Sequence, residues 1–197
     1  MELVPRTELK GLAADRPLDA DTFLNWLTEQ PVDGFELVNG EVYRMAPERN
    51  WHAVYKANAY IALRSAIARV ERDLHVFIDG PGVRVSDRTV REPDVCVNDG
   101  KVDPLALVIE RPVILIEVVS ETSRRQDFGT KLDEYFGIGS VQHYLVLIPE
   151  TKRLIWHSRA DAEGEILTRV LSEGDINLAP HDLNINVEHF FDDSPFE

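Results

Sequence analysis

An apolar run near the middle of the chain most restricts what the protein can fold into. Residues 113–119 read Val-Ile-Leu-Ile-Glu-Val-Val, which is too short for a buried helix and lacks the alternation of a half-exposed strand. The run therefore predicts a strand covered on both faces. Glu117 lies inside it, and an unpaired buried carboxylate costs on the order of several kcal/mol. Glu117 must be protonated, paired with a neighbouring Arg or Lys, or bound to a metal ion.

A second carboxylate, Asp94, follows Pro93 and precedes a short strand-like segment at residues 95–97. The proline stiffens the backbone, so Asp94 is expected at the start of a strand. A Pro-Asp pair alone is typical of a turn. Together with Glu117 on an adjacent strand, however, Asp94 forms a hard-oxygen site of the kind that Mg²⁺ or Mn²⁺ prefers. Asp94 and Glu117 are therefore the candidate metal ligands.

The segment after the apolar run predicts a helix. Ser123 and Gln126 match a capping box at its start. Apolar side chains then recur at helical spacing, at Phe128, Leu132, Tyr135 and Phe136. Because residues four apart share a helix face, Asp127, Lys131 and Tyr135 are expected along one side, near the edge that faces the sheet. A lone helical lysine is otherwise a solvated charge.

A β-hairpin is predicted at residues 35–45, where two strand-like segments flank Asn39-Gly40, the best short signal for a type I′ turn. The two-residue loop sets Val38 opposite Glu41 and Glu36 opposite Tyr43. Glu36 and Glu41 therefore share one face of the hairpin. That face is either solvated or a source of a further acidic site residue.

Other segments complete an α/β pattern. The longest helical pattern covers residues 52–72 and begins at His52. A shorter helix, capped by Asp19 or Asp21, is expected around residues 23–27. Strands are predicted at 75–78, 83–85, 95–97, 144–148, 154–156 and 166–170, with an alternating edge strand at 183–187.

The motifs together resemble a known family. Arg-Glu-Pro-Asp94, Ile-Glu117-Val-Val-Ser120, the Arg-Arg-x-Asp127 turn, Lys131 and Tyr135 resemble the Uma family of restriction endonuclease-like proteins, which belongs to the PD-(D/E)XK nuclease superfamily. The likeness extends over nearly the whole chain. It implies an α/β fold with a restriction endonuclease-like core, in which a mixed central β-sheet carries the site, helices flank it and an antiparallel extension follows.

The resemblance also implies roles for individual residues. Asp94 and Glu117 would hold Mg²⁺ or Mn²⁺ for hydrolysis of a DNA phosphodiester, and Lys131 would orient the attacking water or stabilise the developing charge. Tyr135 and His52 would support the site, the first beneath Lys131 and the second near the substrate. Glu41 is favoured over Glu36 as a third acidic site residue.

Two features depart from the pattern that the resemblance implies. In the superfamily a lysine stands two residues after the strand carboxylate, whereas this sequence has Val119 there. Lys131, from the helix, must therefore replace it. The family also tends to show an acidic residue and a tryptophan in the next strand, and residues 142–149 contain neither.

The charge balance does not favour duplex binding. The chain has 21 Lys and Arg against 35 Asp and Glu, a net charge of −14, whereas a duplex-binding surface is normally basic. Arg124, Arg125 and Lys131 form a local basic strip, so weak and salt-dependent binding is expected. Two alternatives stay open: a catalytically silent binding or regulatory module on a nuclease scaffold, and a nuclease acting on RNA or small nucleotides.

Length and composition predict the organisation of the chain. Its 197 residues suit one domain, residues 1–197, with residues 1–16 as a mobile arm or an irregular packing segment. The single cysteine, Cys96, indicates a reducing compartment without disulfides. Because no leader or long apolar stretch is present, no membrane association and a cytoplasmic location are expected. A homodimer is left open.

Overall fold

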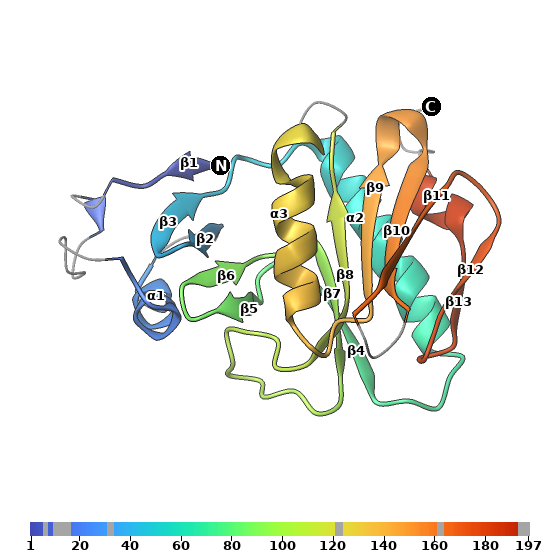
Figure 1. The fold of residues 1–197 in the computed structure, drawn as a ribbon, viewed down its shortest axis with the longest axis horizontal. Coiled ribbons are helices and arrows are strands. Elements are labelled where there is room, and N and C mark those ends of the chain that lie inside the picture. The colour runs from blue at the N-terminus through green and yellow to red at the C-terminus, as the bar shows by residue number, and fades with distance from the viewer. Residues whose placement is uncertain (6–7, 10–16, 31–33, 121–123, 161–163, 193–197) are drawn as a thin grey trace.

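The structure, a computed structural model, describes residues 1–5, 8–9, 17–30, 34–120, 124–160 and 164–192. A six-stranded central sheet stands between two helices, and a five-stranded sheet with a short helix lies at its side (Figure 1). Two further strands form a small sheet of their own at the opposite side. The predicted α/β architecture is confirmed.

The central sheet is mixed, as predicted. Its strand order is β11-β10-β9-β8-β7-β4, and β8 and β9 run parallel while the other neighbours run antiparallel. In chain order the strands are β4 (Leu74–Ile78), β7 (Val95–Asp99), β8 (Pro112–Val118), β9 (His143–Ile148), β10 (Arg153–Arg159) and β11 (Ile166–Leu171). The pairing of β10 with β11 is the predicted antiparallel extension.

Strand β8 is buried along its whole length, as its apolar run predicted. Leu115 belongs to the core under helix α3 (Arg124–Gly137), whereas Ile114 and Ile116 belong to the core under helix α2 (Asn50–Ile67). The alternation of a strand thus sends side chains into two separate cores. Glu117 has the parity of Leu115 and faces α3.

The two helices differ slightly from their predicted bounds. Helix α2 ends at Ile67 rather than at residue 72, because the chain turns after Ala68 to enter β4. Helix α3 covers the predicted segment to Gly137, and the predicted cap at Ser123 lies outside the described residues. No helix in the described ranges is long and apolar enough to cross a membrane.

The five-stranded sheet has the order β1-β3-β2-β6-β5. The strands are β1 (Glu2–Leu3), β2 (Phe35–Val38), β3 (Glu41–Arg44), β5 (Val83–Ser86) and β6 (Thr89–Arg91), of which β1 and β6 were not predicted. The β2–β3 hairpin has the predicted register, and Asn39 and Gly40 take the positive φ values, 52° and 83°, that a type I′ turn requires. Asp19 caps helix α1 (Ala20–Leu27), where its Oδ1 accepts from Thr22 N–H at 2.8 Å.

The two ends of the chain are held by pairing and packing where they are described. Of the two alternatives for the first residues, the packing segment agrees with the described ones, because β1 pairs with β3 and both Val4 and Leu9 are buried. Strand β13 (Leu183–Asn186) is the predicted edge strand, and it ends one residue before Val187. Among the described strands it pairs only with β12 (Asp175–Leu178), and Leu183 and Ile185 pack with η3 (Val187–Phe191) into the core under α2.

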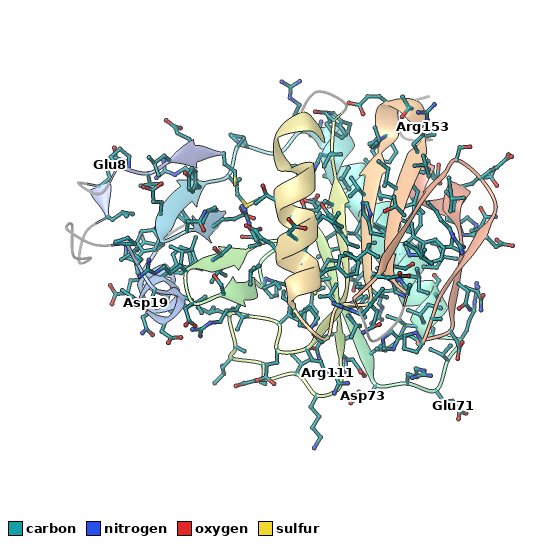
Figure 2. All side chains as sticks on the ribbon, in the orientation of Figure 1. Glu8, Asp19, Glu71, Asp73, Arg111 and Arg153 are labelled. Atoms are coloured by element: carbon teal, nitrogen blue, oxygen red, sulfur yellow. The ribbon has the colours of Figure 1, made fainter. Side chains whose placement is uncertain are left out.

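The side chains at the two ends of the central sheet can be located in Figure 2. Asp73 and Arg111 lie at the end where β4 and β8 begin. Arg153 lies at the opposite end, beside the last residues of β8 and β9. The candidate site is at this second end.

Candidate active site

Asp94 and Glu117 face each other across two paired strands. Val95 pairs with Ile116 in the antiparallel β7–β8 ladder, so the next position outward sets Asp94 opposite Glu117. Both residues are only 6% exposed. Two acidic side chains that the sequence placed on separate segments are therefore brought together at the end of the sheet.

The Asp94 carboxylate is held by the backbone of β8. Its Oδ2 accepts from Val118 N–H at 2.7 Å and lies 3.4 Å from His52 Nε2. Burial and, after it, the neighbouring Glu117 carboxylate raise the pKa of Asp94 to about 7, against opposing contributions from His52, Val118 N–H and Lys56.

The Glu117 carboxylate is held by helix α3. Its Oε1 lies 2.8 Å from Lys131 Nζ and accepts from the Tyr135 hydroxyl at 2.6 Å. The predicted shared face of Lys131 and Tyr135 is confirmed, and the side chain of Asp127 lies outside the described residues. Burial opposes the charge of Lys131, but Glu117 and Glu36 outweigh it and raise the pKa of Lys131.

His52, in the first turn of α2, connects this helix to the end of β8. Its Nδ1 lies 2.6 Å from Glu48 Oε1 and its Nε2 lies 2.8 Å from the carbonyl oxygen of Val118. Its Nε2 also lies 3.4 Å from Asp94 Oδ2, so the ring joins Glu48 and the end of β8 beside Asp94.

Sequence reasoning missed a second buried lysine. Lys56 is 4% exposed, and its Nζ lies 2.5 Å from Glu48 Oε1 and 2.6 Å from Asp79 Oδ1. Glu48, His52 and Lys56 follow one another at intervals of four, which places them along one side of the helix entrance. That spacing is the sequence signal that could have indicated Lys56 as a site residue.

A buried arginine, also missed, ties the site to the smaller sheet. Arg91, on β6, donates to both carboxylate oxygens of Glu134 at 2.8 and 2.9 Å, and to Glu36 Oε2 at 2.9 Å. Glu36 Oε1 also accepts from the backbone N–H of Glu92 at 3.0 Å. This bidentate connection orients α3, and with it Lys131.

The structure does not bring Glu41 to these residues. Glu41 lies exposed at the turn of the β2–β3 hairpin, where its Oε2 accepts from the Tyr43 hydroxyl at 3.3 Å. Glu36, the residue considered less favourable, is the buried one, at 1% exposure. Both side chains point to the same face of the hairpin. Glu36, however, lies two residue pairs further from the turn, where the hairpin meets β6 and Arg91.

A cavity of about 310 Å³ opens onto the site. Its lining includes four of the six predicted site residues, namely His52, Asp94, Glu117 and Lys131, and the missed Lys56. Tyr135 lies behind the lining, where it is fully buried against Tyr144, and Glu41 is not part of it. The cavity therefore presents two buried carboxylates and several cations to whatever enters.

The fold and this Asp–Glu–Lys arrangement define a restriction endonuclease-like protein. A similar fold occurs in the crystal structure described as a putative nuclease belonging to DUF820 from Anabaena variabilis ATCC 29413, with a TM-score of 0.65 over 89% of this chain and 98% of that chain. At 14% sequence identity this likeness concerns the fold alone.

The family follows from the sequence. The family model Uma2, described as putative restriction endonuclease, matches residues 20–188, and the chain belongs to that family. No match is found among curated proteins. The resemblance that the motifs indicated is therefore confirmed over most of the chain.

Proposed function

We propose that this protein is a divalent-metal-dependent endonuclease that hydrolyses phosphodiester bonds in nucleic acid, with DNA as its substrate. One observation supports this most strongly: Asp94 and Glu117 are buried side by side at the end of two paired strands, with Lys131 Nζ 2.8 Å from Glu117. A structural ion pair would need one carboxylate. The second, Asp94, is buried beside the first, and its burial together with the nearby Glu117 charge raises its pKa.

The residues present fit a hard divalent ion. Asp94 makes its contacts through Oδ2 and Glu117 through Oε1, and the other oxygen of each carboxylate makes no hydrogen bond with the described residues. No group of three or more His, Cys, Asp or Glu side chains in the described ranges is placed to hold a metal. Two carboxylates with water and substrate oxygens completing the shell suit Mg²⁺ or Mn²⁺.

Each residue then has a defined task. Asp94 and Glu117 would hold the ion, which when bound polarises the phosphate and lowers the pKa of a water. Lys131 would stabilise the charge that develops on the phosphate oxygens, taking the place of a lysine at Val119. Tyr135 holds the Glu117 carboxylate in position, and the His52 ring lies at the Asp94 side of the cavity.

The first test is metal binding without catalysis. Mg²⁺ or Mn²⁺ should raise the melting temperature, because a ligand of the folded state stabilises it by mass action. Asp94→Asn should abolish this gain. Asp99→Asn, a matched change at the other end of β7, should retain it. An unchanged melting temperature at millimolar metal would refute the metal site.

The second test is cleavage of plasmid DNA, single-stranded DNA and RNA. Lys131→Ala should reduce cleavage by roughly 10²-fold or more, the scale for one preorganised electrostatic group. Lys101→Ala, which removes an exposed lysine after β7, is the control and should cleave as the wild type does. Equal rates for both variants would remove Lys131 from the mechanism.

The alternatives predict different results. The net charge of −14 favours a catalytically silent binding or regulatory module, which would bind metal or nucleic acid but cleave none of the three substrates. Preferential cleavage of RNA would assign the site to RNA instead.

The buried free thiol of Cys96 suits the reducing cytoplasm, which we propose as the location of the protein.

A further inference from the structure

The cavity has two chemically different walls. The polar wall consists of the Asp94, Glu117, Lys131 and His52 side chains described above. The apolar wall includes Met45, Pro47 and Trp51, which come from the β3–α2 connection and the first turn of α2, and it adjoins the polar wall where Trp51 follows His52. A charged phosphodiester backbone gains nothing from contact with apolar side chains, whereas the face of a nucleobase can pack against them.

Trp51 differs from the other two tryptophans of the chain. Trp26 and Trp156 are 7% and 6% exposed, and Trp156 Nε1 donates to His143 Nδ1 at 3.1 Å. Trp51 is only partly buried, and its indole N–H makes no hydrogen bond with the described residues. It is the tryptophan available to a ligand.

The Trp51 ring is also held rigidly. Its centroid lies 5.3 Å from that of His52 and 6.4 Å from that of Tyr55, and the Tyr55 ring in turn lies 6.5 Å from Phe191. These distances are in the range of stabilising aromatic pairs. Because its neighbours already order the ring, little conformational entropy would be lost when a base stacks on it.

Arg49 supplies a cation beside this platform. It precedes α2, is exposed, and lines the cavity. Lys56 and Lys131, the lysines of the lining, are engaged in ion pairs with carboxylates. Arg49 makes no ion pair with any described residue, so its guanidinium is available to a phosphate.

We propose, on the basis of the proposed nuclease function, that this wall binds an unpaired nucleotide: its base stacks on Trp51 and its phosphate pairs with Arg49. The substrate is then a single strand, or a strand opened at the cleavage site. A base inside a duplex has no free face to stack, and extruding it costs a few kcal/mol, roughly. A cavity of about 310 Å³ also suits a small ligand rather than a double helix.

This inference accounts for the charge of the chain. Duplex binding relies on phosphate neutralisation by a broad basic surface, which a net charge of −14 opposes. Single-strand binding draws in addition on base stacking, about 1–3 kcal/mol per base, which does not depend on a basic surface. One exposed arginine with one aromatic platform is consistent with that mode.

Tryptophan emission is a direct test, because the other two tryptophans are buried. The full chain carrying Asp94→Asn is titrated with the oligonucleotide dT8 in EDTA, so that neither metal nor cleavage is involved. We expect quenching of the emission on binding. Wild-type protein in EDTA is titrated in parallel, so that the result does not depend on the Asp94→Asn variant.

Variants of Trp51 separate stacking from the signal. Trp51→Phe should bind dT8 within about 3-fold of the parent but lose the quenching, whereas Trp51→Ala should bind roughly 5- to 150-fold more weakly, the equivalent of one lost stacking contact. Arg49→Ala should weaken binding and flatten its salt dependence. Arg64→Ala, an exposed arginine in the last turn of the same helix, is the matched control and should do neither.

The outcome distinguishes this inference from the proposed function. A duplex of the same length that binds as tightly as dT8, or a Trp51→Ala variant with unchanged affinity, overturns the base-binding wall even if the protein cleaves DNA in Mg²⁺. If dT8 stacks on Trp51 but the wild-type protein cleaves no nucleic acid, the base-binding inference stands and the proposed nuclease function is refuted. The oligonucleotide U8 identifies the strand: tighter binding of dT8 points to DNA, and tighter binding of U8 to RNA, each supporting an unpaired ligand.

Discussion

The two ends of the central sheet differ in whether their buried ionisable groups are charged or neutral. Where β8 finishes, Glu117 and Lys131 are buried in contact, beside Asp94. Where β9 begins, His143 is buried as a neutral ring: burial lowers its pKa to about 4. His143 Nδ1 accepts from Trp156 Nε1 at 3.1 Å, so its proton lies on Nε2, which donates to the carbonyl oxygen of Ala179 at 2.6 Å.

This difference shows what the fold requires and what the site requires. Buried charge is expensive, and an architecture without a task at either end would be expected to keep both ends neutral. The charges are instead concentrated at one end, around a cavity, as is typical of functional sites. The same sheet therefore provides an internal reference for judging the site.

The largest expected effect comes from Arg91, which anchors α3 at the charged end. Arg91→Ala should lower the free energy of unfolding by about 3–5 kcal/mol, because it leaves the Glu36 and Glu134 carboxylates without their cation. Urea denaturation measures this. Arg84→Ala removes an exposed arginine paired with Asp21 and Asp87, and should cost less than about 1 kcal/mol. Similar losses in the two variants would mean that the buried cluster stabilises nothing.

The next effect tests the neutral end. The folded-state pKa of His143, about 4, lies below its ordinary 6.5, so its contribution to stability is complete above pH 6.5 and is lost as the pH falls toward 4. Wild-type protein should lose up to about 3 kcal/mol more than His143→Gln over this range. Glutamine is the replacement because its side-chain oxygen can accept from Trp156 Nε1 and its side-chain N–H can donate to the carbonyl oxygen of Ala179.

The pH series of unfolding free energies needs a control. His75→Gln replaces an exposed histidine at the same end and should follow the wild-type profile. If the unfolding free energy of the wild type changes with pH as little as that of His143→Gln, burial does not lower the pKa of His143.

A smaller effect of opposite sign is expected for Asp94. Its pKa is raised from 3.8 to about 7, so the folded protein favours the protonated form, and this stabilisation is lost as the pH rises through 7. Without metal, Asp94→Asn should be more stable than wild type by about 1–2 kcal/mol at pH 8, with the difference shrinking as the pH falls and vanishing only below about pH 4. The asparagine oxygen can still accept from Val118 N–H. Thermal unfolding in EDTA at both pH values decides the point, and a less stable variant at pH 8 would contradict it.

The smallest effect is expected for Tyr135→Phe. The ring would keep its edge-to-face contact with Tyr144, at 5.0 Å between centroids, and lose only the hydrogen bond to Glu117. Lys131 still pairs with that carboxylate, so a loss of about 1 kcal/mol is expected in urea denaturation. A loss as large as that of Arg91→Ala would mean that the hydroxyl, rather than the ammonium, holds Glu117.

Several parts of the site could be predicted because they depend on local order. The apolar run around Glu117 indicated a strand buried on both faces, and the spacing of Lys131 and Tyr135 placed both on one face of α3, where both contact Glu117. The Asn39-Gly40 turn determined the hairpin register through its backbone geometry.

The contacts of Glu36, Glu41 and Lys56 could not be predicted in this way. Glu36 and Glu41 share a hairpin face, and alternation treats them alike. Only the docking of β6 and α3 against that hairpin buries the first and leaves the second in solvent, through Arg91 contacts that connect residues 55 and 43 positions apart. Lys56 is buried by Glu48 and Asp79, which flank it from separate segments.

The sequence by itself therefore determined the strands, the helix faces and the identities of the acidic and basic candidates, because periodicity and turn chemistry act over a few residues. Tertiary structure alone decided which carboxylates meet, which cations are already paired and which remain available. Those outcomes depend on burial, and burial arises only when distant segments pack together and exclude water from the charges between them.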